Sequence, residues 1–519
     1  MASDVADILT FDGFLSHWAQ ERGDWTAMRE EDRSYSHAEL DALTRKVASA
    51  LIAAGVQKGE RIAWIGKNSD LYFILFYGAA RAGIVMAPIG WRLSPAEWAF
   101  IVNDTRARLV FAGPGFEDLA EKLAGRLDHD PQIVTAGAAR AMIGVATPRD
   151  FDASGPDDAV LQLYTSGTTG NPKGAVLSNR NLFALRRHSD DLDLPYTKWD
   201  DDEAVLVAMP CAHIGGTGLG IMALAAGIPG IILAEFNPDG VFDAVEKHGV
   251  TRFFMVPAAL HMLLMHPRCA SVDYSRLKYI LYGAAPIPLE LLRQCIKMFG
   301  AQFIQAYGMT ETTGTICMLP PEDHDPEGNA RMRSAGKPLP GVEIRILGPD
   351  GRHCAVGEVG EVVTRSSNNM LGYWNLPDAT ANTMTDDGWI RTGDAGYLDA
   401  DGYLFIHDRM KDMIITGGEN VYPAEVESAI FGHPAVQEVA VFGVPDEKWG
   451  EAVKAAVVAK PGETVDEAAI IAWARERIAP FKCPRSVDVI AALPRNASGK
   501  ILRKDLRAPY WEGHERMVN

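Results

Sequence analysis

The amino-acid sequence predicts an α/β fold: a large N-terminal domain of packed, mostly parallel sheets with helices plus a small β region, and a C-terminal α+β domain. Three observations predict it. Apolar runs alternate with helical stretches up to about residue 335, short strands with tight turns follow, and a compact mixture of strand and helix begins near Met410.

The N-terminal alternation is clearest at the apolar runs, most of which stop at Gly or Pro. The pattern predicts an amphipathic helix over 40–55, a buried strand over 61–66, and a helix followed by a strand over 72–85. Five more apolar runs continue it, with helical stretches between them: 204–210, 230–233, 251–257, 277–283 and 301–308. Strands that alternate with helices favour mostly parallel sheets.

The two later regions of the chain have sequence patterns that differ from this alternation and from each other. Turns with the sequences Pro-Asp-Gly at 349–351 and Ala-Asp-Gly at 400–402 predict a small antiparallel β region. Farther on, 426–447 and 453–478 mix strand and helix in a compact α+β unit. A short charged segment, Asp408–Lys411, joins the β region to the α+β unit. We therefore expect one domain over 1–408 and a second over 409–519.

Composition and charge exclude several classes of protein. The chain has 519 residues, of which 47% are hydrophobic and 23% charged, with a net charge of −18. These proportions are typical of a soluble globular protein, and the negative balance argues against a nucleic-acid partner. The six cysteines are far apart and form no Cys-x-x-Cys pair, so we expect free thiols, no structural zinc and a cytoplasmic location.

One uncharged stretch, 204–234, is long enough to cross a membrane. Its interior contains Pro210, His213, Pro229 and several glycines, which would leave backbone groups unpaired in lipid. We therefore predict a buried strand, loop, helix and strand, and no stable membrane insertion. The N-terminus has no secretory signal pattern.

The segment Leu163–Gly174, LYTSGTTGNPKG, is rich in hydrogen-bond donors and follows an apolar strand. Glycines let backbone N–H groups approach phosphate oxygens, and a lysine adds a positive charge. The phosphate loop of nucleoside triphosphatases has Ser or Thr directly after its lysine to hold magnesium. Here Lys173 is followed by Gly174, so that class does not fit.

This segment resembles the phosphate-loop signature of the adenylate-forming superfamily, which includes acyl-CoA synthetases, luciferases and peptide-synthetase adenylation domains. Five further family signatures follow in the family's order: YGAAPI at 282–287, QAYGMTE at 305–311, WIRTGD at 389–394, DRMKDMIITGGENVYPAEVE at 408–427 and PRNASGK at 494–500. The resemblance spans almost the whole chain. It implies that the C-terminal domain is mobile and that ATP, Mg²⁺ and CoA are used.

The resemblance also assigns the nucleotide site. The phosphate loop is represented by Thr165, Ser166, Gly167, Thr168, Thr169, Gly170 and Lys173; the adenine pocket by Gly283, Ala284, Ala285, Ala306, Tyr307 and Gly308; the phosphate and ribose contacts by Thr310, Asp394 and Arg409. Glu311 is expected to hold Mg²⁺ together with Thr165, other ligands being phosphate oxygens and waters. Lys500 is expected at the α-phosphate and the substrate carboxylate, where it stabilises charge in the transition state.

The acid is expected to be neutral and apolar. The loop before the acyl pocket, 210–220, contains no acidic side chain that could pair with an amino group. Acetate-specific relatives have Trp where this chain has Gly308, which indicates a deeper pocket. His213 resembles the family's gate residue beside the carboxylate, and we expect the pocket at His213, Gly215, Gly216, Gly308 and Gly314. A medium- or long-chain fatty acid is the first choice, and an aryl acid of the cinnamate or benzoate kind is the alternative.

The acceptor is expected to be CoA, since no carrier domain follows Lys500. In the family the C-terminal domain rotates between the two half-reactions, and Lys411 occupies the hinge position. After rotation Gly417, Gly418, Glu419 and Trp449 would line the pantetheine tunnel. The expected partners are therefore small molecules, with a homodimer left open.

Two other enzyme classes remain as distant alternatives. Gly218-Leu-Gly220-Ile-Met-Ala223 matches the GxGxxA pattern of dinucleotide-dependent oxidoreductases, but Pro210–Gly216 separates it from its strand. A luciferase-like oxygenase shares the same superfamily. The presence of Lys173, Glu311, Asp394 and Lys500 together favours an active ligase.

Overall fold

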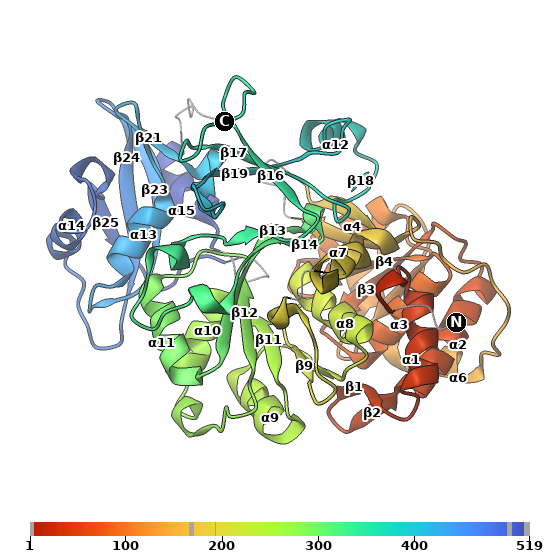
Figure 1. Ribbon diagram of the computed structural model, residues 1–519. Coiled ribbons are helices and arrows are strands. Elements are labelled where there is room, and N and C mark those ends of the chain that lie inside the picture. The colour runs from red at the N-terminus through yellow and green to blue at the C-terminus, as the bar shows by residue number, and fades with distance from the viewer. Residues whose placement is uncertain (1–4, 166–170, 192–193, 496–500, 513–519) are drawn as a thin grey trace.

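The computed structural model describes residues 5–165, 171–191, 194–495 and 501–512. The chain forms two large sheets, a small antiparallel sheet and a C-terminal unit with a sheet of its own (Figure 1). The mixed α/β architecture predicted from the alternating apolar runs is confirmed.

The first large sheet has seven strands in the order β18-β8-β7-β4-β3-β5-β6. From β7 to β6 the neighbours are parallel, whereas β8 and β18 are antiparallel additions at one edge. The strands are β3 Arg61–Gly66, β4 Val85–Gly90, β5 Leu109–Ala112, β6 Gln132–Thr135, β7 Ala159–Thr165, β8 Lys173–Ser178 and β18 Gly372–Tyr373. The hairpin β7–β8 thus carries both stems of the predicted phosphate loop.

The second large sheet has nine strands in the order β15-β14-β13-β12-β11-β9-β10-β1-β2. Its six strands from β13 to β1 are parallel, and antiparallel strands finish both edges. The strands are β1 Thr26–Glu30, β2 Arg33–Ser36, β9 Val205–Val207, β10 Gly230–Ile232, β11 Arg252–Met255, β12 Tyr279–Gly283, β13 Gln302–Met309, β14 Gly314–Leu319 and β15 Lys337–Pro338.

Helix α3, Asp70–Arg81, joins the two large sheets, because it packs on β4 and β7 of one and on β1 of the other. All twelve of its residues are buried, which explains why the segment is apolar on every side. It also meets α8, Ile214–Ala226, closely: a Cβ on Gly220 would lie 2.2 Å from the Phe73 ring. Small residues in α8 therefore serve helix packing rather than a dinucleotide.

The N-terminal part contains ten further α-helices in the described residues. They are α1 Phe11–Glu21, α2 His37–Ala53, α4 Pro95–Thr105, α5 Leu119–Leu123, α6 Ala136–Val145, α7 Asn179–Asp191, α9 Pro238–His248, α10 Pro257–Met265, α11 Leu289–Phe299 and α12 Pro377–Thr383. The uncharged stretch 204–234 forms β9, a loop, α8 and β10, as predicted. Within the described ranges, no helix has the length and apolar character needed to cross a bilayer.

The small sheet is antiparallel, as the tight turns predicted, in the order β16-β17-β19-β20. Its strands are β16 Glu343–Leu347, β17 Gly360–Arg365, β19 Ile390–Leu398 and β20 Leu404–Arg409. The strands β19 and β20 bring Asp394 opposite Arg409.

The C-terminal unit has its own sheet and its own apolar core around Ile414, Val441 and Ile470. It contains β21 Ile414–Thr416, β22 Glu419–Val421, β23 Val436–Asp446, β24 Gly450–Ala459, β25 Ser486–Val489, α13 Pro423–Phe431, α14 Glu467–Arg475 and α15 Arg503–Trp511. One 3₁₀ turn, Met410–Asp412, joins it to β20. The exact domain boundary at 408/409 stays a prediction.

Candidate active site

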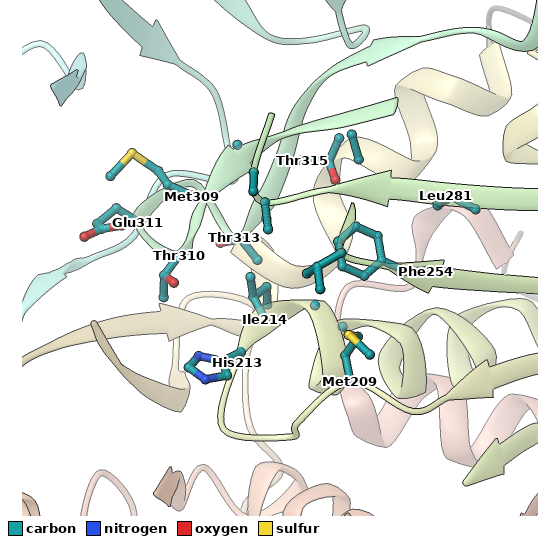
Figure 2. Close-up of a pocket in the computed structure, with 18 of the residues that line it drawn as sticks. Met209, His213, Ile214, Phe254, Leu281, Met309, Thr310, Glu311, Thr313 and Thr315 are labelled. Atoms are coloured by element: carbon teal, nitrogen blue, oxygen red, sulfur yellow. The ribbon is translucent and has the colours of Figure 1, made fainter. Parts of the chain in front are cut away.

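A cavity of about 1930 Å³ lies where the C-terminal ends of the parallel strands meet the C-terminal unit. Such ends of α/β sheets are common ligand sites. One end of the cavity is polar, with Lys173, Thr310, Glu311 and Arg409 in its wall. The other end is apolar. Figure 2 shows Thr310 and Glu311 at one side and Phe254, Leu281 and Met209 at the other, with His213 and Ile214 between them.

At the polar end, Asp394 is held between two partners. The Tyr307 hydroxyl donates to Asp394 Oδ2 at 2.6 Å, and Arg409 Nε lies 2.9 Å from Oδ1. Arg409 is fixed in turn by donating from Nη1 to the Thr392 carbonyl at 2.8 Å. Each carboxylate oxygen still has a free lone pair, so Asp394 can also accept hydroxyl donors.

The burial of Tyr307 and the nearby Asp394 carboxylate both raise the pKa of Tyr307, so its hydroxyl keeps its proton. Gly393 and Arg409 line the cavity, and Asp394 follows Gly393 in β19 opposite Arg409. Tyr307 lies in β13 between the lining residues Ala306 and Gly308. The structure thus brings Tyr307, Asp394 and Arg409 together, while their roles toward a nucleotide stay a prediction.

A second polar group surrounds Glu311, which begins the 3₁₀ turn after β13 with Thr310. The Glu311 side chain is only 5% exposed, and Tyr373 donates from its hydroxyl to Oε1 at 2.6 Å. Lys173 Nζ lies 5.1 Å from the centre of the Tyr373 ring. Thr165 and Lys173 are cross-strand partners at the end of the β7–β8 hairpin where the chain passes from one strand to the other.

The predicted adenine pocket is made of small residues at the ends of β12 and β13. Ala284 has φ of +64°, a left-handed conformation that costs a non-glycine residue about 1 kcal/mol or more. A Cβ on Gly283 would lie 2.1 Å from the Ala306 carbonyl oxygen, so glycine is required for the contact between these strands. Ala284, Ala285, Ala306 and Gly308 line the cavity.

His213 precedes α8 and stands between the two ends of the cavity. Burial and the nearby Arg92 charge lower the pKa of His213 to about 4, so its ring is neutral at physiological pH. Its Nε2 atom is buried without a hydrogen-bond partner in the described part of the chain. A buried nitrogen without a partner costs about 1–3 kcal/mol, so a ligand oxygen placed beside it would relieve this cost.

The apolar end of the cavity is formed mainly by α8, β11, β12, β13 and β14. Met209, Met222 and Met318 line the cavity with Ile214, Leu219, Phe254, Leu281 and Ile304. Met309 also lines it, but on the side of Glu311 (Figure 2). Methionine side chains are flexible and fit irregular shapes. The Phe254 ring is close to the helix start, because a Cβ on Gly215 would lie 3.1 Å from it.

Two of the glycines predicted to widen the acyl pocket have another role. A Cβ on Gly216 would lie 2.2 Å from the Met209 carbonyl oxygen, and Gly216 is absent from the described residues that line the cavity. A Cβ on Gly308 would lie 1.6 Å from the Gly314 carbonyl oxygen, which means that β14 itself excludes a side chain there. The prediction that Gly216 lines the pocket is therefore wrong, and Gly308 is small because of strand packing. Gly215 and Gly314 do line the cavity.

The C-terminal unit presents one face to the cavity. Lys411, Glu427, Glu438, Arg495 and Arg503 from this face line it. In contrast, Gly417 and Trp449 pack against each other: the Gly417 N–H donates to the Trp449 carbonyl oxygen at 2.8 Å. Of the described lining residues, none belongs to the predicted tunnel set Gly417, Gly418, Glu419 and Trp449. Lys500 and Ser166–Gly170 lie outside the described residues.

Two residues of the site were not identified from the sequence. Tyr373 and Phe254 both line the cavity, yet each belongs to a stretch that shows only apolar or turn character. The one available signal was the aromatic pair Tyr373–Trp374 after a glycine, in an otherwise polar region.

This fold and site define an adenylate-forming enzyme. Residues 15–374 match the model of the AMP-binding enzyme family, and residues 425–500 match that of its C-terminal domain. The chain therefore belongs to the AMP-binding enzymes, as an adenylate-forming member of the acyl-CoA synthetase family. Within this family the chain is an acid–thiol ligase.

Three similar proteins illustrate the range of the family. A fatty acid–[acyl-carrier-protein] ligase of Streptomyces coeruleorubidus is 39% identical, over 97% of both chains. A feruloyl-CoA synthase of an Amycolatopsis species is also 39% identical, over 93% of this chain and 95% of that protein. Among solved structures, o-succinylbenzoate CoA synthetase of Bacillus subtilis with its acyl-adenylate intermediate has a TM-score of 0.84 and 32% identity, over 95% of this chain and 97% of that one.

Proposed function

We propose that the protein activates a hydrophobic carboxylic acid with ATP through an acyl-adenylate and transfers the acyl group to CoA, releasing AMP and pyrophosphate. The observation that carries the proposal is the position of His213. Its unpartnered Nε2 lies between the polar end of the cavity, with Glu311 and Lys173, and the apolar end, with Phe254. A carboxylate bound there would have its tail among apolar side chains and its oxygens toward the phosphates.

In the first half-reaction, a carboxylate oxygen of the acid attacks the α-phosphorus of ATP. The bond from this phosphorus to the oxygen that bridges the α- and β-phosphates breaks, and pyrophosphate leaves. We assign the phosphates to Lys173, Thr310 and the Thr165 hydroxyl, and the ribose hydroxyls to Asp394 and Arg409. Neutral His213 orients the attacking carboxylate by donating to it, provided that Nε2 carries the proton.

Magnesium fits the donors present at this site. Glu311 supplies a nearly buried carboxylate with one oxygen beyond the Tyr373 hydrogen bond, and Thr165 supplies a hydroxyl. In the described part of the chain, no group of three or more His, Cys, Asp or Glu could hold a metal. That suits Mg²⁺, which usually takes one or two carboxylates and completes its shell with phosphates and waters. When bound, Mg²⁺ would neutralise phosphate charge during adenylation.

In the second half-reaction, the thiolate sulfur of CoA attacks the acyl carbon, and AMP leaves with the electrons of the broken C–O bond. We assign Lys500 to the first step only and the tunnel residues Gly417, Gly418, Glu419 and Trp449 to the second, with Lys411 as the hinge. The cavity face formed by Arg495 and Arg503, which flank Lys500 in the chain, supports an arrangement suited to adenylation. The domain division at 408/409 belongs to this proposal.

For the acid, we favour a medium- or long-chain fatty acid, with an aryl acid of the cinnamate or benzoate kind as the alternative. The methionines Met209, Met222 and Met318 in the cavity wall support a flexible tail. The names of two of the relatives described above cover both classes, one referring to a fatty acid and the other to a feruloyl group.

The test is a panel of acids in a pyrophosphate-release assay, with and without CoA. Aliphatic acids of two to eighteen carbons and aryl acids are compared by kcat/KM, with thioester formation followed separately. We expect pyrophosphate release to depend on an apolar acid and to become catalytic when CoA is added. No acid-dependent release with any member of the panel would contradict the proposal.

A carrier-protein thiol is a second candidate acceptor, because one relative with 39% identity is named as an acyl-carrier-protein ligase. Both acceptors attack through the same phosphopantetheine thiol, so the first half-reaction does not separate them. CoA and a phosphopantetheinylated carrier protein should be compared at equal thiol concentration. We expect at least a tenfold higher kcat/KM for CoA, about 1.4 kcal/mol of discrimination; the reverse ratio would assign the carrier protein.

A further inference from the structure

We infer that Tyr373 is a positioning residue that holds the carboxylate of Glu311 and the ammonium group of Lys173 in one fixed arrangement. The inference rests on the proposed function, because it takes Glu311 as the magnesium ligand and Lys173 as a phosphate contact. Neither residue is near Tyr373 in the sequence. Glu311 is 62 residues away, and the two residues meet only through the fold.

The first step of the argument is the direct contact. The Tyr373 hydroxyl donates to Glu311 Oε1 at 2.6 Å, a short bond to a carboxylate that is 5% exposed. One carboxylate oxygen is thereby committed to a neutral donor, which fixes the plane of the carboxylate and leaves Oε2 to face a cation. Hydrogen bonds to a ligating carboxylate from outside its metal shell commonly set ligand geometry.

The second step is the lysine. Lys173 Nζ lies 5.1 Å from the centre of the Tyr373 ring, within the range of a cation–π contact. One side chain, that of Tyr373, therefore contacts both the ammonium group of Lys173 and the carboxylate of Glu311. Both charged residues line the cavity.

The third step is the backbone that carries Tyr373. The segment 370–374 connects the 3₁₀ turn that bears Glu311 with the strand β8 that bears Lys173. At one end the Met370 N–H donates to the Glu311 carbonyl oxygen at 2.8 Å. At the other end the Trp374 N–H donates to the Gly174 carbonyl oxygen at 2.8 Å, next to Lys173.

The side chain of Trp374 anchors this segment from behind. Its Nε1 donates to the Asp104 carbonyl oxygen at 2.9 Å, and the Arg61 guanidinium carbon lies 3.3 Å from its ring centre. Arg61 also donates to Gln162 of β7 at 3.1 Å. The backbone that carries Tyr373 is thus anchored at the edge of the seven-stranded sheet. A residue that positions other side chains needs such a fixed backbone.

The test compares Tyr373→Phe with Tyr403→Phe. Tyr403 is a matched control, because its hydroxyl also donates to a buried carboxylate, Asp323 Oδ2, at 2.6 Å. Unlike Tyr373 and Glu311, Tyr403 and Asp323 are not among the described residues that line the cavity. The first readout is binding without turnover. The melting-temperature increase given by a non-hydrolysable ATP analogue is measured across a Mg²⁺ titration, with EDTA as the zero point.

We expect Tyr373→Phe to raise the half-maximal Mg²⁺ concentration about tenfold, the lower range of such effects. Tyr403→Phe should leave it within twofold of the wild type. In pyrophosphate exchange, kcat of Tyr373→Phe should fall while the KM of the acid stays unchanged. An unchanged Mg²⁺ midpoint in Tyr373→Phe, with its folding intact, would overturn the inference.

Glu311→Gln and the double variant with Tyr373→Phe separate this inference from the function on which it rests. If Tyr373 acts through Glu311, the double variant should be no worse than Glu311→Gln alone. Additive losses would mean that Tyr373 acts on something else and would overturn the inference alone. If Glu311→Gln has a wild-type Mg²⁺ midpoint, the proposed metal role of Glu311 is wrong, and the inference falls with it.

Discussion

The Tyr307 hydroxyl and the Asp394 carboxylate are 2.6 Å apart, although 87 residues separate them in the chain. One residue comes from the large nine-stranded sheet and the other from the small antiparallel sheet. This hydrogen bond therefore ties the predicted adenine contact to the predicted ribose contact, and both should respond when it is removed.

Tyr307→Phe keeps the ring and removes only the donor. A hydrogen bond to a charged group contributes about 1.5–3 kcal/mol, so we expect the KM for ATP to rise about tenfold or more. Steady-state kinetics at saturating acid will measure this. Tyr282→Phe is the control, because its hydroxyl pairs with His324 away from the cavity. An unchanged KM in Tyr307→Phe would mean that Asp394 is positioned by Arg409 alone.

Gly308→Ala should destabilise the protein rather than retune its acid preference. The added Cβ would lie 1.6 Å from the Gly314 carbonyl oxygen, so β13 and β14 must separate. Overpacking of this kind typically costs about 1–3 kcal/mol, which denaturant unfolding can resolve. Gly137→Ala, in helix α6 with open space around it, should cost nothing. Wild-type stability with a shortened acid preference would restore the interpretation of Gly308 as a pocket residue.

Phe254→Ala should widen the acyl pocket next to Gly215. Because the ring fills the space beside the start of α8, its loss makes room for branched or two-ring acids. A change of this size in an apolar pocket shifts discrimination by about 1–3 kcal/mol, or roughly 10–200-fold in the ratio of kcat/KM values. The KM for ATP serves as the internal control and should not change. Equal selectivity in the variant and the wild type would place the acid elsewhere.

His213 should make the protein less stable in acid. Its pKa is lowered to about 4 in the folded protein, mainly by burial, against about 6.5 unfolded. The unfolded chain therefore binds the proton first, and this contribution is complete above pH 6.5 and is lost as the pH falls toward 4. His213→Gln should flatten this part of the curve when unfolding free energies are measured at pH 7.5 and 5.0. Parallel curves for the two proteins would show that His213 titrates normally.

Much of the fold and of the polar site could be predicted from the sequence, for identifiable reasons. Runs such as 61–66 are apolar because both faces of the sheet are covered, and most of them end at a glycine or proline. Asp394 and Arg409 each lie in a signature segment, so their proximity followed from the resemblance. The prediction for Gly216 was wrong, and Gly308 lines the cavity but is small for another reason than the one predicted. The sequence does not distinguish a glycine that widens a pocket from one that packs against a carbonyl oxygen. Tyr373 was missed because its partners are distant in the chain.

Lys500→Ala should damage only the first half-reaction. The segments beside Lys500 face the cavity through Arg495 and Arg503, whereas the Gly417–Trp449 contact lies outside the described cavity wall. If the C-terminal unit rotates about Lys411 between the steps, the Lys500 loop leaves when the thiol arrives.

Loss of a charge partner in the transition state costs on the order of 10²–10³ in rate, so acyl-adenylate formation should fall by at least about a hundredfold. With preformed acyl-adenylate, the same variant should still form the thioester at nearly the wild-type rate. Single-turnover measurements of both half-reactions will decide, because equal losses in the two would mean that Lys500 supports the structure or that both steps use one domain arrangement.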